Sequence, residues 1–252
     1  MKKILLITIL FFARTVAWTY PSYYGPFEPN AVPKLYPLQE CACISGKNDK
    51  SKVFALKKNS VHRIIVTQSD KDEWFGYIVT MKDTSSNVLL KPCEIGGYQG
   101  FSPNVYTALL NEDKEPDYLI VTWSGGCGIG AGMASLSFLL SCDNGYQLAK
   151  VVSFYPDETC FVDLNRDGKP ELIHTDFVHG EKGKDGKTHN YWVYNLLQFK
   201  GTKIVSANKI DKRFLCWIWY KFKPNHKNTT QLSSDQKSRL WKKQKFNIKY
   251  QE

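Results

Sequence analysis

Apolar and polar residues alternate over short distances along most of this chain. From residue 41 onward, apolar, β-branched and aromatic runs of five to ten residues are separated by clusters of Asn, Asp, Gly, Ser or Lys, as in "VHRIIVTQ", "DYLIVTW" and "YWVYNLLQF". Runs of this length between turn-forming residues are typical of antiparallel strands. The pattern therefore predicts a mainly β fold built from antiparallel units.

The pattern changes near the C-terminus, where helical spacing appears for the first time. Ser233 is followed three residues later by Gln236, and good helix formers continue beyond it. A serine with a glutamine three positions on is a helix start signal, so we expect an α-helix over residues 233–245. This divides the chain into a β-rich repeat domain over residues 41–225 and a basic helical segment over residues 226–252.

Two further segments precede the predicted domain. Residues 1–17 have two lysines, an apolar run of about ten residues and small residues ending at Ala17, which is the layout of an export signal. A membrane span needs about twenty apolar residues, so a retained anchor is the weaker interpretation. We expect a secreted or periplasmic chain, cleaved near Ala17 and without a transmembrane segment. Residues 18–40 contain five prolines among aromatics and predict an extended arm or linker.

Charge and cysteine content refine this picture. The formal net charge is +10, but from Asn195 to the C-terminus fourteen Lys and Arg stand against three acids, so the basicity belongs to the C-terminal segment. That segment suits an anionic surface or an acidic partner, or is simply a solvated face. Nucleic acid is not expected as the partner of an exported protein. Seven cysteines in such a chain predict one to three disulfides, with Cys127–Cys142 the first candidate pair, or else buried apolar thiols.

A short internal repeat links two turns of the chain. The stretch "LNEDKEPDYLIVTW" (residues 110–123) aligns with "LNRDGKPELIHTDF" (residues 164–177) at an offset of 54 residues. The match places Asp117 on Glu171, and both acids lead into a predicted strand. Chance similarity between turn sequences is the alternative explanation. If the repeat is real, the fold consists of β units of about this length.

The second of these turns has the spacing of a calcium loop. Asp163, Asn165 and Asp167 stand at positions 1, 3 and 5, the Lys169 carbonyl at position 7 and Glu171 at position 9. Calcium binds six to eight oxygens, and alternating side chains around a tight turn supply them. Position 12, however, is a histidine, and a strand follows the loop rather than a helix. The competing interpretation is an Asx-rich turn without an ion.

The motif "DLNRDGKPELI" resembles the DxNxDGxxE/D loop of FG-GAP or VCBS-type repeats, and "PDYLIVTWSGGCGIG" is similar to a segment that accompanies such loops in exported bacterial proteins. The resemblance covers roughly residues 110–180. It implies β repeat units arranged in a propeller-like or sandwich form, and calcium held by Asp163, Asn165, Asp167, the Lys169 carbonyl and Glu171. The earlier copy has Leu109 in place of the first acid and Lys114 in place of the glycine, so we expect no ion there.

Catalytic interpretations compete with a binding function. His174, Asp176 and His179 lie close together in the sequence, and Cys127 stands in the glycine-rich stretch "SGGCGIG"; either group is a candidate for a secreted hydrolase. The polar face of an ordinary strand and a disulfide explain the same residues. No residue set establishes an activity. We therefore expect an exported binding module with a structural calcium ion and a protein, glycan or anionic surface as its ligand. The alternatives are the hydrolase and a periplasmic inhibitor or immunity-type protein.

Overall fold

The prediction of a mainly β fold is confirmed by the computed structural model, which describes residues 36–48, 50–57, 60–156, 160–182, 186–207, 217–219 and 229–230. Three antiparallel sheets account for its strands, and the described residues also contain one short 3₁₀ helix, η1 (Gly128–Gly132). The predicted export signal, most of the proline-rich arm and the predicted helix over residues 233–245 lie outside the described residues.

The first sheet, here called the N-terminal sheet, is a meander of five strands. It runs in the order β2 (Ala42–Asn48), β3 (Ser51–Ala55), β4 (Arg63–Gln68), β5 (Phe75–Lys82) and β6 (Val88–Tyr98). Each strand pairs with the next one along the chain. Such local pairing follows from the short turns that the sequence places between the strands.

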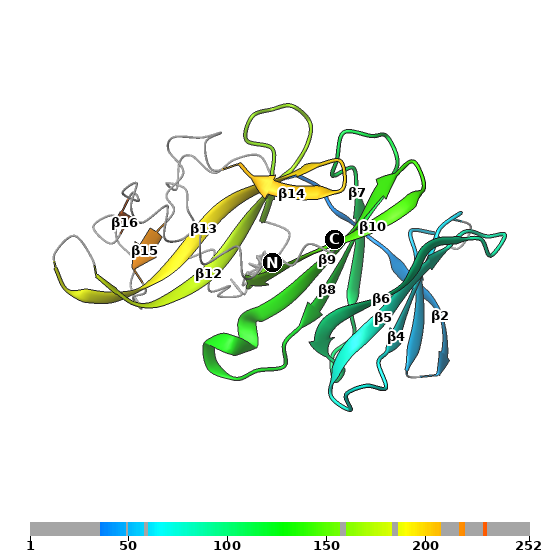
Figure 1. Cartoon of the computed structure of the whole chain (residues 1–252), viewed down its shortest axis with the longest axis horizontal. Helices are drawn as coiled ribbons and strands as arrows, with labels where there is room; N and C mark the ends of the chain where they lie inside the picture. Colours follow the sequence, from blue (N-terminus) through cyan, green and yellow to red (C-terminus); the bar gives the residue numbers. More distant parts are fainter. Residues whose placement is uncertain are drawn as a thin grey trace, which may run out of the picture.

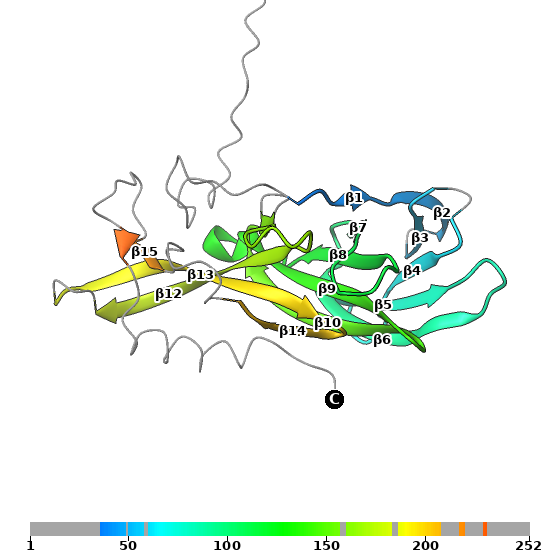
Figure 2. The same ribbon diagram turned by 90° about the horizontal axis from the view of Figure 1, so that it is seen from above.

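The central sheet has the order β1 (Gln39–Glu40), β7 (Asn104–Ala108), β8 (Asp117–Trp123), β9 (Met133–Cys142) and β10 (Gly145–Phe154). Strand β1 precedes the N-terminal sheet in the sequence but pairs with β7 of the central sheet. The chain therefore crosses the edge of the central sheet before it forms the N-terminal one, as Figure 2 shows.

The C-terminal sheet begins with β11 (Phe161–Val162), β12 (Glu171–Lys182) and β13 (Thr188–Lys200). Two elements then share the far side of β13: β14 (Lys203–Ser206) pairs with its end, and β15 (Trp217–Trp219) pairs with its earlier residues. Strand β16 (Thr229–Thr230) pairs with β15. Figure 1 shows the three sheets in a row, in the order of the sequence.

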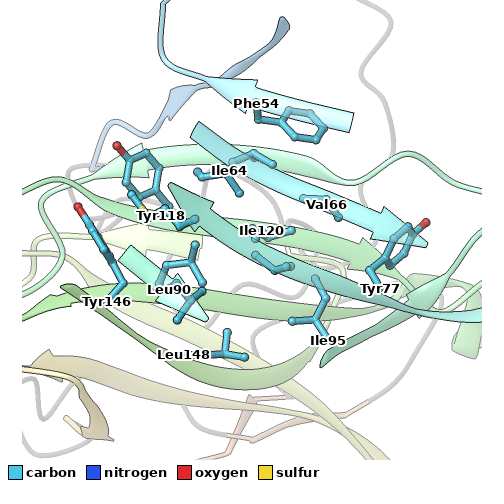
Figure 3. Packing of buried hydrophobic residues seen from close by; sticks show 14 of the residues in the cluster. Phe54, Ile64, Val66, Tyr77, Leu90, Ile95, Tyr118, Ile120, Tyr146 and Leu148 are labelled. Carbon is cyan, nitrogen blue, oxygen red and sulfur yellow. The ribbon is translucent and has the colours of Figure 1, made fainter. Parts of the chain in front are cut away.

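The central sheet is covered on both faces, which explains why its strands are apolar throughout. On β8, Tyr118 and Ile120 pack against the N-terminal sheet, whereas the alternate residues Leu119 and Val121 pack toward the C-terminal sheet. Successive side chains of a strand point to opposite faces, so a strand buried on both sides needs a continuous apolar run. Figure 3 shows the first of these two interfaces, with Ile120 among residues of the N-terminal sheet.

Candidate functional site

The predicted calcium loop connects β11 to β12 and is shaped by its own polar side chains. The Asn165 Oδ1 atom accepts the N–H of Asp167 at 3.1 Å, and the Asp167 Oδ1 atom accepts the N–H of Lys169 at 2.8 Å. The Asp163 Oδ2 atom accepts the N–H of Gly168 at 3.2 Å. Gly168 has a φ of 82°, which suits a residue without a Cβ. These bonds turn the side chains at positions 1, 3 and 5 inward, toward the loop backbone.

One carboxylate oxygen of this loop is left without a donor. The Asp163 Oδ1 atom is buried, and among the described residues no group donates a hydrogen bond to it. A buried carboxylate oxygen is costly unless a donor or a cation compensates it. The polar groups of the loop are carboxylate, amide and carbonyl oxygens, which are the ligands that calcium prefers. The residues present therefore fit calcium in their chemistry.

Glu171 closes the base of the loop. It is 1% exposed, and its Oε2 atom accepts the N–H of Leu164 at 2.8 Å. Burial raises the pKa of Glu171, and the nearby Asp167 and Asp163 carboxylates raise it further. Within the described part of the chain, no three His, Cys, Asp or Glu side chains converge as a metal cluster. Glu171 thus joins the two ends of the loop, whether or not it also contacts an ion.

The first copy of the repeat folds in the same way. The Asp117 Oδ2 atom accepts the N–H of Leu110 at 2.7 Å, as Glu171 does for Leu164. The Asn111 Oδ1 atom accepts the N–H of Asp113 at 3.1 Å, as the asparagine at position 3 of the second loop does for its own aspartate. The two loops therefore share a hydrogen-bond pattern at the offset seen in the sequence.

The first copy differs from the second in having protein donors for its acids. The Ser141 Oγ atom lies 2.7 Å from Asp113 Oδ2 and 3.0 Å from Asp117 Oδ1, and its single hydroxyl proton is shared between these two acceptors. The backbone N–H of Ser141 also donates to Asp117 Oδ1, at 2.8 Å. Since Ser141 and the Asn111 backbone N–H satisfy these carboxylates, this loop needs no cation.

Tyr36 links the two loops. Its N–H donates to the Phe161 carbonyl at 2.8 Å, just before the second loop, and its hydroxyl donates to the Leu109 carbonyl at 3.0 Å, at the start of the first. Glu112 of the first loop accepts the N–H of Gly201, in the turn between β13 and β14, at 2.8 Å. Both loops therefore lie where the central and C-terminal sheets meet.

The hydrolase candidates His174 and His179 both lie on β12 but differ in burial. His174 lies on β12, is 1% exposed, and its Nε2 atom is 2.7 Å from the Val152 carbonyl. Burial lowers the pKa of His174. His179 lies near the irregularity that follows Val178, is exposed, and contacts Asn190 through Nδ1 at 2.6 Å. A buried histidine bonded to a backbone carbonyl is placed to support the sheet rather than to reach a substrate.

The structure does not bring the predicted disulfide pair, Cys127 and Cys142, within bonding distance. Cys127 precedes η1 and is exposed, whereas Cys142 ends β9, and both are free thiols. The stretch between the two cysteines contains the single strand β9, which spans ten residues from Met133 to Cys142. At about 3.4 Å per residue, this strand separates the two cysteines. Cys41, Cys43 and Cys93 are free thiols as well, and Cys216 lies outside the described ranges.

Sequence reasoning missed a surface cluster of aromatic rings. Trp74, Phe75 and Phe101 are 56%, 48% and 52% exposed and gather around Tyr98. The available signal was the "DEWFG" stretch, in which two large aromatics follow two acids at the start of a strand. The alternation of a strand does not indicate that the first residues of this stretch face solvent.

Comparison with protein-family models finds no match, and comparisons with curated proteins and with solved structures find no similar protein either. Within the described ranges, no helix is both long enough and apolar enough to cross a membrane.

Proposed function

We propose that this chain is an exported binding module of repeated β units, in which the loop between β11 and β12 binds a structural calcium ion. The observation that carries the calcium proposal is the buried Asp163 Oδ1 atom, for which no described residue supplies a donor. A calcium ion at this point would compensate it and would draw further oxygens from Asn165, Asp167, the Lys169 carbonyl and Glu171. Its role there is to stiffen the loop.

The two loops support the idea of repeated units. Each follows the first strand of a meander, β7 or β11, and each ends at the acid that begins the next strand, Asp117 or Glu171. The shared hydrogen bonds at both places are what duplication of a β unit of FG-GAP or VCBS type would leave. The basic helix over residues 233–245 and export through residues 1–17 stay part of this proposal as predictions.

A binding function is favoured over a hydrolase based on the His174 region by the surroundings of His174 and Asp176. His174 is buried on β12 of the C-terminal sheet. The Asp176 Oδ1 atom accepts the N–H of Phe177 at 2.7 Å. A periplasmic inhibitor or immunity-type protein would also act by binding, so it stays within the same class of function.

The experiment compares thermal unfolding in EDTA and in about 5 mM calcium. Extracellular calcium modules bind on the order of 10⁻⁴ to 10⁻³ M, so this concentration should stabilise the protein by about 1 to 2 kcal/mol, or roughly 3 to 6 °C in melting temperature. The Asp163→Ala, Asp167→Ala double variant should lose this shift.

The matched control is Asp113→Ala, the equivalent of Asp167→Ala in the first loop. It should lower the melting temperature in both buffers but keep the calcium shift. If calcium moves neither the wild type nor the control, the loop is an Asx-rich turn and the calcium proposal fails.

A further inference from the structure

Three exposed aromatic residues, Trp74, Phe75 and Phe101, gather around the half-buried Tyr98. Trp74 stacks on Tyr98 with ring centroids 6.3 Å apart and planes 10° apart, while Phe75 and Phe101 contact Tyr98 at centroid distances of 5.7 and 5.6 Å. We call these four residues the aromatic platform. They lie where β5 begins and β6 ends, two neighbouring strands labelled in Figure 1. Large exposed aromatics gathered in one place, rather than scattered singly, mark interaction sites.

The platform is held rigidly by polar side chains beneath it. The Gln99 amide donates to the carbonyls of Ser69 and Gly76 at 2.8 and 2.9 Å, which ties the turn before β5 to the end of β6. The hydroxyl of Tyr77 lies 3.1 Å from the carbonyl oxygen of Tyr98 and 2.6 Å from that of Phe101, and donates between them. A rigid surface loses little entropy on binding, so this bracing favours a ligand over accidental exposure.

A glycine from the central sheet completes the support. A Cβ at Gly125, after the end of β8, would overlap the ring of Tyr98, and Gly125 has a φ of 69°. The backbone between β8 and η1 therefore lies directly against this ring. The platform is thus built by the N-terminal and central sheets together.

The charged residues beside the aromatic platform indicate what kind of partner it binds. The turn over residues 70–75, "DKDEWF", carries three carboxylates and one lysine, all exposed. Lys71 pairs with Glu94, and Asp70 pairs with Lys50. The two acids that directly precede the tryptophan, at positions 72 and 73, form no ion pair with a described residue. Although Asp72 Oδ1 accepts the N–H groups of Trp74 and Phe75, two carboxylates that have no cationic partner and stand beside a tryptophan face attract a cation and repel an anion.

We propose that the aromatic platform, with Asp72 and Glu73 at its rim, binds a basic peptide segment through arginine or lysine side chains. The rings supply the face on which a guanidinium or ammonium group stacks, and the two carboxylates supply the charge-assisted hydrogen bonds. This names the partner of the proposed binding module, and it rests on the binding part of that function and not on calcium.

The test uses fluorescence anisotropy with a labelled peptide of alternating glycine and arginine and the same peptide carrying citrulline in place of arginine. Citrulline keeps nearly the length and shape of arginine but has no charge. The full chain should bind the arginine peptide at least about fivefold more tightly than the citrulline peptide. Because the whole chain has a net charge of +10, attraction of a basic peptide requires a local site.

Two variants locate the site. Trp74→Ala removes the stacking face. The Asp72→Asn, Glu73→Gln double variant removes the charge, while the amide oxygen introduced by D72N can still accept the N–H of Trp74. Each variant should weaken binding of the arginine peptide at least about fivefold.

Two matched controls change similar side chains away from the platform. Val88→Ala removes an apolar side chain that is 53% exposed on β6, and Asp143→Asn neutralises an exposed acid between β9 and β10. Both variants should bind the arginine peptide as the wild type does.

Equal binding of both peptides, or unchanged binding by the two platform variants, would overturn the proposal. Binding of a neutral oligosaccharide such as cellohexaose that depends on Trp74, without binding of the arginine peptide, would overturn it in favour of a glycan. Peptide binding is measured in EDTA, so the result does not depend on calcium. Peptide binding without calcium stabilisation would support the platform proposal alone, and calcium stabilisation without peptide binding would support the calcium proposal alone.

Discussion

Asp117 and Glu171 perform the same task at the starts of β8 and β12: each carboxylate accepts the N–H of the leucine seven residues before it. The two acids differ in what else they meet. Asp117 also receives the N–H groups of Asn111 and Ser141 and the Ser141 hydroxyl. The first loop is therefore closed by protein groups, whereas the second leaves Asp163 Oδ1 without a donor among the described residues.

The first prediction concerns the strength of this closure. Asp117→Ala leaves several buried donors without an acceptor, and each such loss is costly inside a protein. We expect the free energy of unfolding to fall by about 3 kcal/mol, measured by urea denaturation. Glu171→Ala, which frees the N–H of Leu164, should cost less, about 1 to 2 kcal/mol in EDTA. Equal losses would mean that the Ser141 network adds nothing.

The second prediction tests the packing of Tyr98 against Gly125. Alanine at position 125 combines a positive φ with a Cβ that overlaps the ring, so Gly125→Ala should destabilise the protein by at least about 2 kcal/mol. Gly128 also has a positive φ, 59°, but no atom within 4 Å of the added Cβ, so Gly128→Ala should cost only about 1 kcal/mol. Similar melting temperatures for the two variants would contradict the contact with Tyr98.

The third prediction is a dependence of stability on pH through His174. Burial holds the pKa of His174 below its ordinary value near 6.5, although Asp176 opposes this shift, so the unfolded chain binds a proton more readily than the folded one. The stability from neutral His174 is present above about pH 6.5 and is lost as the pH falls toward the folded pKa, at up to about 1.4 kcal/mol per pH unit. His174→Gln should flatten this slope between about pH 6.5 and 5.

The control for this experiment is His62, whose pKa burial also lowers and whose Nδ1 atom lies 2.8 Å from the Tyr118 hydroxyl. His62 is less buried than His174, so His62→Gln should remove a smaller part of the slope. Unfolding free energies measured at several pH values separate the two contributions. If the dependence of unfolding free energy on pH is unchanged in His174→Gln, the folded protein accepts a proton at His174 as readily as the unfolded chain does, and the prediction is wrong.

The strands could be predicted from the sequence because burial determines the pattern of apolar and polar residues along each strand. The run "DYLIVTW" is apolar throughout most of its length since β8 is covered on both faces, and the following turn carries the glycines that end strands. The similarity between the loops at residues 109–116 and 163–170 can be recognised in the sequence because the same asparagine and acid positions make the hydrogen bonds that close each loop.

What the sequence did not indicate depends on contacts between distant segments. Strand β1 pairs with β7 although the whole N-terminal sheet separates them in the sequence, and nothing local to Gln39 and Glu40 selects that partner. The aromatic platform joins residues near positions 75 and 98, and Gly125 lies against the Tyr98 ring from the connection after β8, so no single stretch displays it. The sequence likewise does not indicate the burial of His174, because the polar spacing of a strand is the same at a solvent-exposed face and at a covered one.

The last prediction concerns the thiols. Cys127 is exposed, whereas Cys41 is 3% exposed and burial raises its pKa to about 11. Since the thiolate is the reactive form, Cys127 should be alkylated by iodoacetamide in the native protein at about pH 8, and Cys41 should react only after unfolding. Mass spectrometry of tryptic peptides measures both. Cys142, half-buried at the end of β9, should also appear as a free thiol. Recovery of a disulfide-linked Cys127–Cys142 peptide from unreduced protein would contradict the strand that separates them.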